Sequence, residues 1–143
     1  MPNVNEIMST RVQVIAPEAT LRQAAQLMLA LDVGALPVCR GPTVLGMVTD
    51  RDITVRGVAA GLPPDVACVS DVMTKEPASC TEDQDTEHVM QVMGKAQVRR
   101  LPVVNLAHEL VGIVSIGDLA RRQTGPIDQM VREISEPSTP RPV

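Results

Sequence analysis

Two short stretches of this chain each place a hydroxyl and a carboxylate three residues apart, directly after an apolar run. Thr49 and Asp52 close the first stretch, and Ser115 and Asp118 close the second. Carboxylates accept hydrogen bonds, and hydroxyls both donate and accept them, so each pair could bind a polar ligand. The same spacing is also a capping box, in which the two side chains only start a helix. Both interpretations stay open for either stretch taken alone.

The segments that carry these stretches occur twice in the chain. Residues 7–10 match residues 72–75, and residues 35–38 match residues 100–103, each at a spacing of 65 residues. The two hydroxyl–carboxylate stretches follow in the same order at a spacing of 66, with one extra residue in the preceding turn. Matched blocks in one order predict two tandem units.

Each unit is predicted to contain an extended segment, a helix, two strands and a second helix. Thr20 and Gln23 form a capping box ahead of the first helix, whose apolar residues repeat at helical spacing, and Gly34 suits its end. The other predicted elements of the first unit are an extended segment at residues 13–15, strands at 36–39 and 44–48, and a helix over 50–58.

The second unit repeats this order. Its predicted elements are a helix over residues 86–95, strands at 101–105 and 110–115, a helix to about residue 122, and a last short helix over 127–134. We therefore expect an α/β (α+β) fold of two pseudo-symmetric β-α-β-β-α units that share an aliphatic core. The expected boundaries are a first unit at 1–61, a linker at 62–70, a second unit at 71–124, and a short helix with a proline-rich tail at 125–143.

Composition narrows the classes of partner. The chain has 143 residues, a net charge of −4 and no aromatic side chain. These values argue against a nucleic-acid surface, which needs a basic stripe or stacking rings. No apolar run approaches the roughly 18 residues that span a membrane. Cys39, Cys68 and Cys80 have no disulfide or zinc-site spacing, which fits a reducing cytoplasm.

The repeat, the Leu-Pro-Val strands, the Gly-h-h-Thr/Ser-x-x-Asp stretches and the Val-Met-Thr segment resemble the cystathionine β-synthase (CBS) domain pair. The resemblance covers about residues 3–122, and the version at residues 49–53 is similar to small stand-alone bacterial CBS-pair proteins. It implies a pseudo-symmetric Bateman-type module, usually a homodimer, that binds AMP, ADP or ATP, or sometimes S-adenosylmethionine or NAD, in a cleft. It also implies regulation rather than catalysis.

The resemblance also implies roles for single residues. Asp52 and Asp118 match the carboxylates that bind the ribose hydroxyls, and Thr49 and Ser115 match the hydroxyls that reach phosphate or ribose. Both roles agree with the chemistry of a vicinal diol and of an anion at a helix start. The positions that match the family's adenine-binding slot are aliphatic: Val14, Ile15, Leu36, Pro37, Leu101 and Pro102.

Arginines near these positions could bind the phosphates. Arg51 follows Thr49, and Arg100 precedes the second Leu-Pro-Val, where the first unit has Ala35. We expect the better phosphate site to use Arg100 or Arg51, and the alternative is that both form ion pairs at the surface. The second stretch has Ile116-Gly117 where the first has Asp50-Arg51, so the two half-sites are not equivalent.

The sequence therefore predicts a cytoplasmic, non-enzymatic sensor of adenine nucleotides that signals by conformational change to an effector protein. The alternative is a ligand-free CBS pair that dimerises and holds partners together. An enzyme is disfavoured because no nucleophile and base are spaced for catalysis. His88 and His108 have no partners at metal-ligand spacing, so no metal site is predicted.

Overall fold

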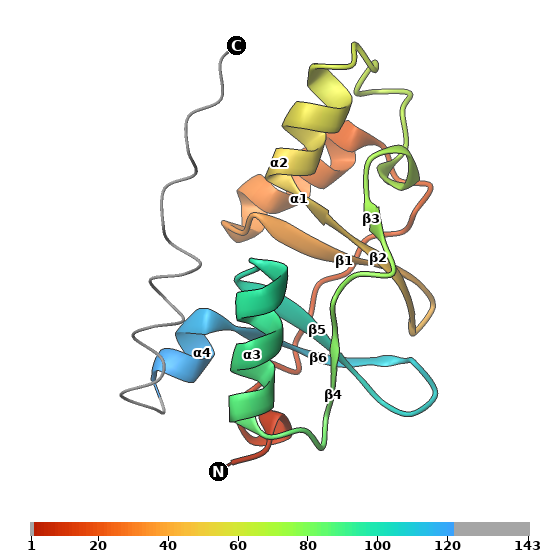
Figure 1. Ribbon diagram of the computed structural model, residues 1–143. Coiled ribbons are helices and arrows are strands. Elements are labelled where there is room, and N and C mark those ends of the chain that lie inside the picture. The colour runs from red at the N-terminus through yellow and green to blue at the C-terminus, as the bar shows by residue number, and fades with distance from the viewer. Residues whose placement is uncertain (1, 122–143) are drawn as a thin grey trace. The chain divides into compact units, whose positions relative to one another are not determined.

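The computed structural model describes residues 2–121, and one order of helices and strands occurs twice within them (Figure 1). The first copy contains α1 (Leu21–Leu31), β1 (Ala35–Arg40), β2 (Thr43–Thr49) and α2 (Asp50–Asp52). The second copy contains α3 (Thr86–Ala96), β5 (Arg100–Val104), β6 (Leu110–Ser115) and α4 (Ile116–Ala120). Two short strands, β3 (Thr74–Lys75) and β4 (Cys80–Thr81), complete sheets of order β1-β2-β3 and β4-β5-β6. The expected mixed α/β fold is confirmed; the helix expected at 127–134 and the tail lie outside the described residues.

Helix α1 begins where the sequence predicts and ends differently. Thr20 Oγ1 accepts a hydrogen bond from the Gln23 N–H at 3.1 Å, and the Gln23 side chain accepts one from the Thr20 N–H at 2.9 Å. Asp32, rather than Gly34, adopts the left-handed conformation that ends the helix, with φ of 55°. Gly34 has a packing role instead, because a Cβ at this position would lie 3.0 Å from Oδ2 of Asp50.

The helix that follows β2 changes its winding after the first turn, where the sequence predicts one regular helix. A π-helical stretch, Ile53–Val58, continues directly from α2, and the Ala59 N–H bonds to the Thr54 carbonyl at 2.9 Å. Gly57 faces α1, since a Cβ there would lie 2.9 Å from Cδ1 of Leu21. Such π segments inside helices occur frequently at functional sites.

The compact units of the structure do not follow the sequence repeats. The first unit consists of residues 11–77 and 105–110, and the second of residues 2–10, 78–104 and 111–121. In the second unit Ser9 and Ile113 exchange two backbone hydrogen bonds, each of 2.9 Å. The matching residues Thr74 and Met47 pair in the first unit. Each repeat therefore contributes its leading segment to the unit built around the other repeat.

This exchange differs from the boundaries expected at residues 61 and 71, which follow the repeat in sequence. The stretch expected to be a linker, residues 62–70, belongs to the first unit. Its Ala67 is buried, and the Ala67 carbonyl accepts a hydrogen bond from the Leu21 N–H at 3.0 Å. A segment that satisfies backbone groups at the start of α1 is part of the fold rather than a tether.

Each unit has its own aliphatic core, built from matching positions of the two repeats. The core of the first unit contains Ile15, Leu21, Ala24, Met28, Leu36, Val38, Val48, Ala67, Val69 and Val72. The core of the second unit contains Val4, Cys80, Val89, Met90, Met93, Leu101, Val103, Val114 and Leu119. Both cores consist of aliphatic and sulfur-containing side chains without aromatic rings, as the composition requires.

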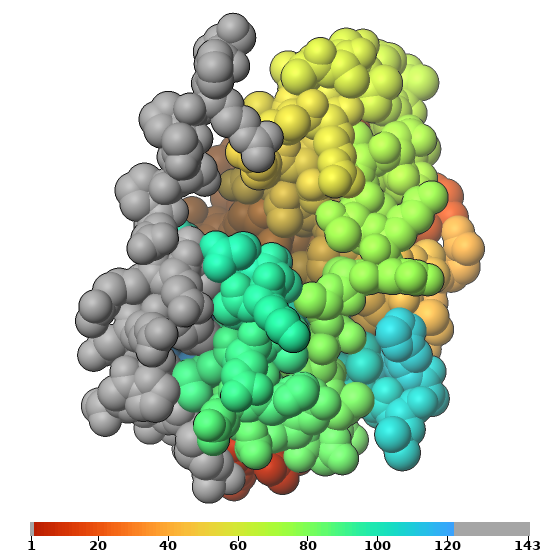
Figure 2. Space-filling view, in the orientation of Figure 1, coloured from red at the N-terminus to blue at the C-terminus, as the bar shows by residue number. Residues whose placement is uncertain are grey.

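Apolar side chains also remain exposed on the helices of the first unit. Leu29 on α1 is 83% exposed, and Val55 and Val58 in the π-helical stretch are 48% and 66% exposed. Figure 2 shows this stretch, coloured yellow, at the surface of one face. The positions that match Leu29 and Val55 in the second repeat carry Gly94 and Arg121. Leu29 and Val55 therefore have no apolar counterparts at the matching positions of the second repeat.

Candidate functional site

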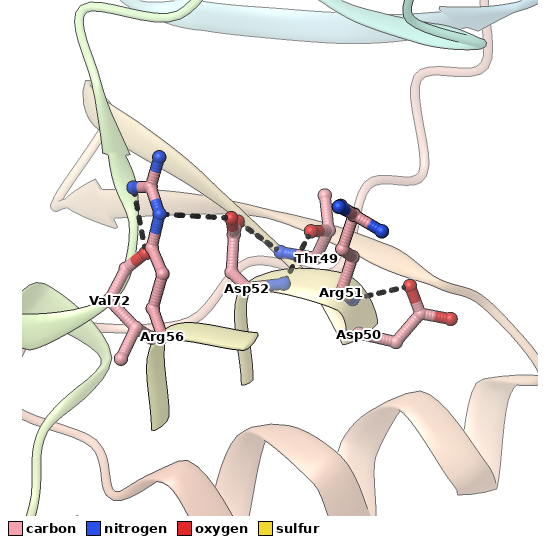
Figure 3. A network of polar contacts seen from close by, with 6 residues as sticks. All are labelled: Thr49, Asp50, Arg51, Asp52, Arg56 and Val72. Atoms are coloured by element: carbon pink, nitrogen blue, oxygen red, sulfur yellow. Dashed lines mark hydrogen bonds and ion pairs between the residues drawn. The ribbon is translucent and has the colours of Figure 1, made fainter. Parts of the chain in front are cut away.

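The first corner, residues 49–52, is the point where β2 turns directly into α2 (Figure 3). Thr49 Oγ1 accepts a hydrogen bond from the Asp52 N–H at 3.0 Å, and Asp52 Oδ2 accepts one from the Thr49 N–H at 2.9 Å. The pairing of the strands places Thr49 opposite Ala35, at the start of β1. The Asp52 side chain is only 13% exposed. The capping box therefore holds the carboxylate in one orientation.

The second corner, residues 115–118, repeats this geometry where β6 turns into α4. Ser115 Oγ accepts a hydrogen bond from the Asp118 N–H at 3.1 Å, and Asp118 Oδ2 accepts one from the Ser115 N–H at 2.8 Å. The Asp118 side chain is 14% exposed. Both predicted pairs are thus capping boxes, and this structural role holds whether or not a ligand binds.

In each corner the second carboxylate oxygen faces an arginine of the same helical segment. Asp52 Oδ1 lies 3.9 Å from Nε of Arg56, four residues later. Asp118 Oδ1 pairs with Nη2 of Arg121, three residues later. Neither arginine was predicted from the sequence to belong to a corner. Their spacing of three or four residues after the aspartate was the available signal, because such residues are neighbours on a helix surface.

The residues beside the two corners differ in size and charge. In the first unit the Asp50 N–H bonds to the Gly34 carbonyl at 2.9 Å, and Asp50 Oδ1 accepts a hydrogen bond from the Arg51 N–H at 2.8 Å. In the second unit the equivalent backbone bond, also 2.9 Å long, joins the Ile116 N–H to the carbonyl of Arg99. Gly34 and Asp50 in the first unit therefore correspond to Arg99 and Ile116 in the second.

Three guanidinium groups near the corners have no protein partner within residues 2–121. The side chains of Arg51, Arg99 and Arg100 form neither a hydrogen bond nor an ion pair there. Arg51 and Arg99 are exposed, and Arg100 is half-buried at the start of β5. The surface pairing that was the alternative for Arg51 and Arg100 is thus not formed in the described part of the chain.

The positions predicted to line the adenine slot are mostly buried. Leu36 and Leu101 are 2% and 0% exposed and belong to the two aliphatic cores, and Ile15 is 7% exposed. The Ile15 N–H bonds to the carbonyl of Pro37 at 3.0 Å, which fixes this extended segment alongside β1. Val14 is half-buried. Apart from Val14, these positions therefore offer little exposed side-chain surface to a ligand.

The structure divides the predicted site residues between the two units. The first unit contains Val14, Ile15, Leu36, Pro37, Thr49, Arg51 and Asp52, and the second unit contains Arg100, Leu101, Pro102, Ser115 and Asp118. Each unit therefore has one complete set of hydroxyl, carboxylate and Leu-Pro strand. The residue before Leu-Pro is the uncharged Ala35 in the first set and Arg100 in the second.

The remaining polar chemistry is sparse in residues 2–121. No three His, Cys, Asp or Glu side chains lie close enough together in this range to hold a metal ion. Burial raises the pKa of the Cys80 thiol to about 12 and also raises that of Cys39. A hydrogen bond from Arg40 lowers the pKa of the exposed Glu18. No helix in this part of the chain has the length and apolar character to span a bilayer.

Comparison with protein families decides what the doubled fold is. The sequence profile of the CBS domain matches residues 4–56 and again residues 69–125. The chain belongs to the CBS domain family. The CBS domain-containing protein YhcV of Bacillus subtilis (strain 168) is 42% identical over 123 residues, which is 86% of each chain. The resemblance noted in the sequence is therefore confirmed for both repeats of this CBS protein.

Solved structures agree with this assignment. Hypoxic response protein I, crystallised with two coordinated zinc ions, has a TM-score of 0.79 and 38% identity, and the match covers 86% of this chain and 100% of that one. CBSX2 of Arabidopsis thaliana, solved in complex with AMP, has a TM-score of 0.73 and 26% identity, covering 85% and 95%. The part of this CBS protein described by the structure does not supply a zinc ligand set within one chain.

Proposed function

We propose that this CBS protein is a regulatory module that binds an adenine nucleotide of the AMP, ADP or ATP class and signals to an effector protein. The observation that carries the proposal is the doubled corner. In each unit Oδ2 of the aspartate holds the cap, and Oδ1 contacts only an arginine side chain within residues 2–121. A ribose offers two adjacent O–H donors, which suit such a carboxylate oxygen. A relative of 26% identity was solved with AMP.

The hydroxyls of the corners have a matching capacity. Thr49 Oγ1 and Ser115 Oγ each accept one backbone hydrogen bond, and within the described residues the hydroxyl hydrogen is not used. It can therefore be donated to a ribose or phosphate oxygen. Adenine would lie against Val14, Ile15 and Pro37 or against Leu101 and Pro102, with aliphatic contacts in place of aromatic stacking.

The phosphates are assigned to the second corner. Its surroundings carry three guanidinium groups and one carboxylate, whereas the first corner has two of each; the second-corner groups are those of Arg99, Arg100, Arg121 and Asp118. Guanidinium groups bind phosphate oxygens through charge-assisted hydrogen bonds. Arg100 begins the strand that contains Leu101 and Pro102, and we assign it the main phosphate contact, with Arg51 as the corresponding group of the first corner.

Titration calorimetry with AMP, ADP and ATP tests this function, with NAD and S-adenosylmethionine as the alternative adenosine ligands. A hydrogen bond to a charged group contributes roughly 1.5–3 kcal/mol. Asp52→Ala or Asp118→Ala should therefore weaken binding about 10- to 100-fold. No heat with any of these compounds at millimolar concentration would refute the proposal.

A matched control separates ligand binding from capping. Asp71 Oδ2 accepts a hydrogen bond from the Cys68 N–H at 2.8 Å, so it forms the same kind of cap outside both corners. Asp71→Ala should reduce stability like the corner variants and leave nucleotide affinity unchanged. If all three aspartate variants lose only stability, the corners are caps without a ligand.

The alternative function is a ligand-free CBS pair that dimerises and holds other proteins together. The exposed Leu29, Val55 and Val58 favour a protein contact on the helices of the first unit, and we include a homodimer in the proposal. Light scattering checks the dimer, and a monomer would remove it. Because the chain has no aromatic residue, a copurified nucleotide would dominate absorbance at 260 nm, whereas a ligand-free scaffold would be nearly transparent there.

The proposal is regulatory and cytoplasmic rather than catalytic. The three cysteines are free thiols, which suits a reducing compartment. Neither corner combines a nucleophile with a base, since each carboxylate is engaged by a backbone N–H and an arginine. Turnover of a nucleotide that is lost in a corner variant would contradict this part of the proposal.

A further inference from the structure

Arg56 connects the first corner to a different segment of the chain. Its Nε lies 3.9 Å from Asp52 Oδ1, and its Nη1 donates a hydrogen bond of 3.4 Å to the carbonyl of Val72 (Figure 3). The planar guanidinium group presents several donors in a fixed arrangement, so one side chain can contact both acceptors. Arg56 therefore relates the position of the corner carboxylate to the position of Val72.

A ligand at the first corner would compete with this arginine. Asp52 Oδ2 already accepts a hydrogen bond from the Thr49 N–H at 2.9 Å, so Oδ1, which faces Arg56, is the more available oxygen for a ribose hydroxyl. The Arg56 side chain is 56% exposed and Asp52 is 13% exposed, so the arginine can move while the carboxylate stays fixed by its cap. Binding of a diol to Asp52 thus acts first on Arg56.

Val72 lies in the segment that leads from the first repeat to the second. It is 1% exposed, and its N–H bonds to the Val69 carbonyl at 3.1 Å in a short 3₁₀ turn, Val69–Asp71. Strand β3 follows, paired with β2 at Gly46 and Met47. The chain then continues to β4 of the second unit. The segment therefore leads to one of the points, after Pro77, at which the chain passes from the first unit to the second.

The second corner lacks this link. Arg121 pairs with Asp118, and within residues 2–121 its side chain makes no hydrogen bond to another segment. The π-helical winding of Ile53–Val58 accompanies the difference, since the first corner uses the arginine four residues after the aspartate and the second uses the one three residues after it.

We propose that Arg56 is a positioning residue that couples occupancy of the first corner to residues 69–75. A nucleotide ribose on Asp52 draws Arg56 away from Val72 and loosens this segment, so the first corner reports binding and the second mainly holds phosphate. This inference rests on the proposed nucleotide binding and adds the route by which binding is signalled.

Amide hydrogen exchange of residues 69–75 in the full chain, without and with saturating AMP, tests the coupling. In the wild-type protein AMP should raise exchange in this segment roughly threefold or more, because the bond that is lost is long and partly exposed and has only a modest net strength. Arg56→Ala should show the faster exchange already without AMP and no further response. Arg56→Lys, which keeps the charge but lacks the planar donor arrangement, should behave like Arg56→Ala.

A control outside both corners makes the outcome specific. Arg22 forms an exposed ion pair of 3.1 Å with Asp65, and Arg22→Ala should keep the AMP response of residues 69–75. If Arg56→Ala binds AMP by calorimetry and residues 69–75 still respond as in wild type, the coupling is wrong while nucleotide binding stands. If the wild-type protein binds no nucleotide, both proposals fail. Equal exchange of these residues in ligand-free wild type and Arg56→Ala also refutes the coupling.

Discussion

The two corners of this CBS protein share one backbone geometry and differ in nearly everything around it. In both, an aspartate Oδ2 caps the N–H of the preceding hydroxyl residue, at 2.9 Å in the first corner and 2.8 Å in the second. The first corner then adds Asp50 and an arginine that reaches Val72. The second adds Ile116 and the guanidinium groups of Arg99 and Arg100, which have no partner among residues 2–121.

The difference teaches which part of the motif serves folding and which serves a ligand. A capping box satisfies backbone N–H groups where a strand turns directly into a helix, and it is present in both repeats. The flanking positions carry no such requirement and can differ between the repeats. Substitutions of matching cap residues should therefore lower the stability of the protein by similar amounts. Substitutions of the flanking residues should affect ligand binding differently in the two corners.

The largest expected difference between the units is in how their stability depends on pH. It arises at one matched position of the two cores, which is Ile15 in the first unit and Cys80 in the second. Burial raises the pKa of Cys80 from the ordinary value of 9.0 to about 12. The unfolded thiol loses its proton first, so stability is complete below pH 9 and falls as the pH rises towards 12, by about 1.4 kcal/mol per pH unit.

Denaturant unfolding of wild type and Cys80→Ala between pH 7 and 11 measures this effect. The free energy of unfolding of the variant should fall less with rising pH. The packing that alanine loses lowers the stability equally at every pH, so it does not affect the slope of this free energy against pH. The chain contains no tyrosine to titrate in this range. Cys39→Ala serves as the comparison in the first unit, because Cys39 is also buried with a raised pKa. Equal slopes for wild type and Cys80→Ala would contradict the prediction.

The matched glycines of β2 and β6 should rank second. A Cβ on Gly46 would lie 2.6 Å from the Thr74 carbonyl oxygen, and a Cβ on Gly112 would lie 2.5 Å from Met8 Sδ and 2.9 Å from the Ser9 carbonyl oxygen. Both alanine variants should lose about 1–3 kcal/mol by overpacking. Gly46→Ala should lose more, because backbone moves less readily than the end of a methionine.

Gly117→Ala is the control for these two variants. Its Cβ would lie 3.6 Å from Ser115 Oγ, an ordinary contact, and alanine favours the helix more than glycine does. Urea midpoints should therefore place Gly46→Ala lowest, Gly112→Ala next, and Gly117→Ala at or above wild type. A neutral Gly46→Ala would show that β3 is not held against β2 as described.

The third comparison sets Arg100 against Arg51 in phosphate binding. Arg100→Ala should weaken ATP binding about 10-fold and adenosine binding little, because only the phosphates carry the charge that it contacts. Arg51→Ala should have a smaller effect, since Asp50 and Asp52 offset positive charge at the first corner. Calorimetry with ATP and adenosine measures both. The reverse order would move the phosphate site to the first corner.

Much of the fold could be predicted from the sequence because local rules determine it. The capping box at Thr20 and Gln23 gave the start of α1, and the repeat gave the second copy of each element. The exchange of leading segments could not be predicted, because residues 7–10 and 72–75 are alike and the strands β2 and β6 both present a glycine to receive them. Sequence similarity does not distinguish between two equivalent acceptors.

The candidate site, like the fold, could be predicted from the sequence only where local spacing determines it. Thr49, Asp52, Ser115 and Asp118 were found from their spacing, and the structure places them in the two corners. The bond from Arg56 to Val72 was not foreseen, since it joins residues 16 positions apart and depends on the π-helical winding. Whether the corners bind a nucleotide stays a prediction, because a capping box has the same sequence pattern with or without a ligand.

The smallest effect is expected where α1 and α3 end. Asp32 and Gln97 both adopt the left-handed conformation with φ of 55°. Aspartate tolerates this region through its short polar side chain, whereas glutamine does not. Gln97→Gly should therefore stabilise the protein by about 0.5 kcal/mol, less than the full steric penalty because glycine also gains freedom in the unfolded chain. Asp32→Gly should leave stability nearly unchanged.

Thermal unfolding of the two glycine variants checks this last contrast between the units. The bond from Gln97 Nε2 to the Gly94 carbonyl, 2.9 Å long and exposed, is lost in Gln97→Gly and reduces the gain. A gain that remains therefore reports relief of backbone strain rather than a new contact. Equal shifts for both variants would mean that the left-handed turn has the same strain whichever side chain occupies it, and that the two helix ends, unlike the two corners, are equivalent.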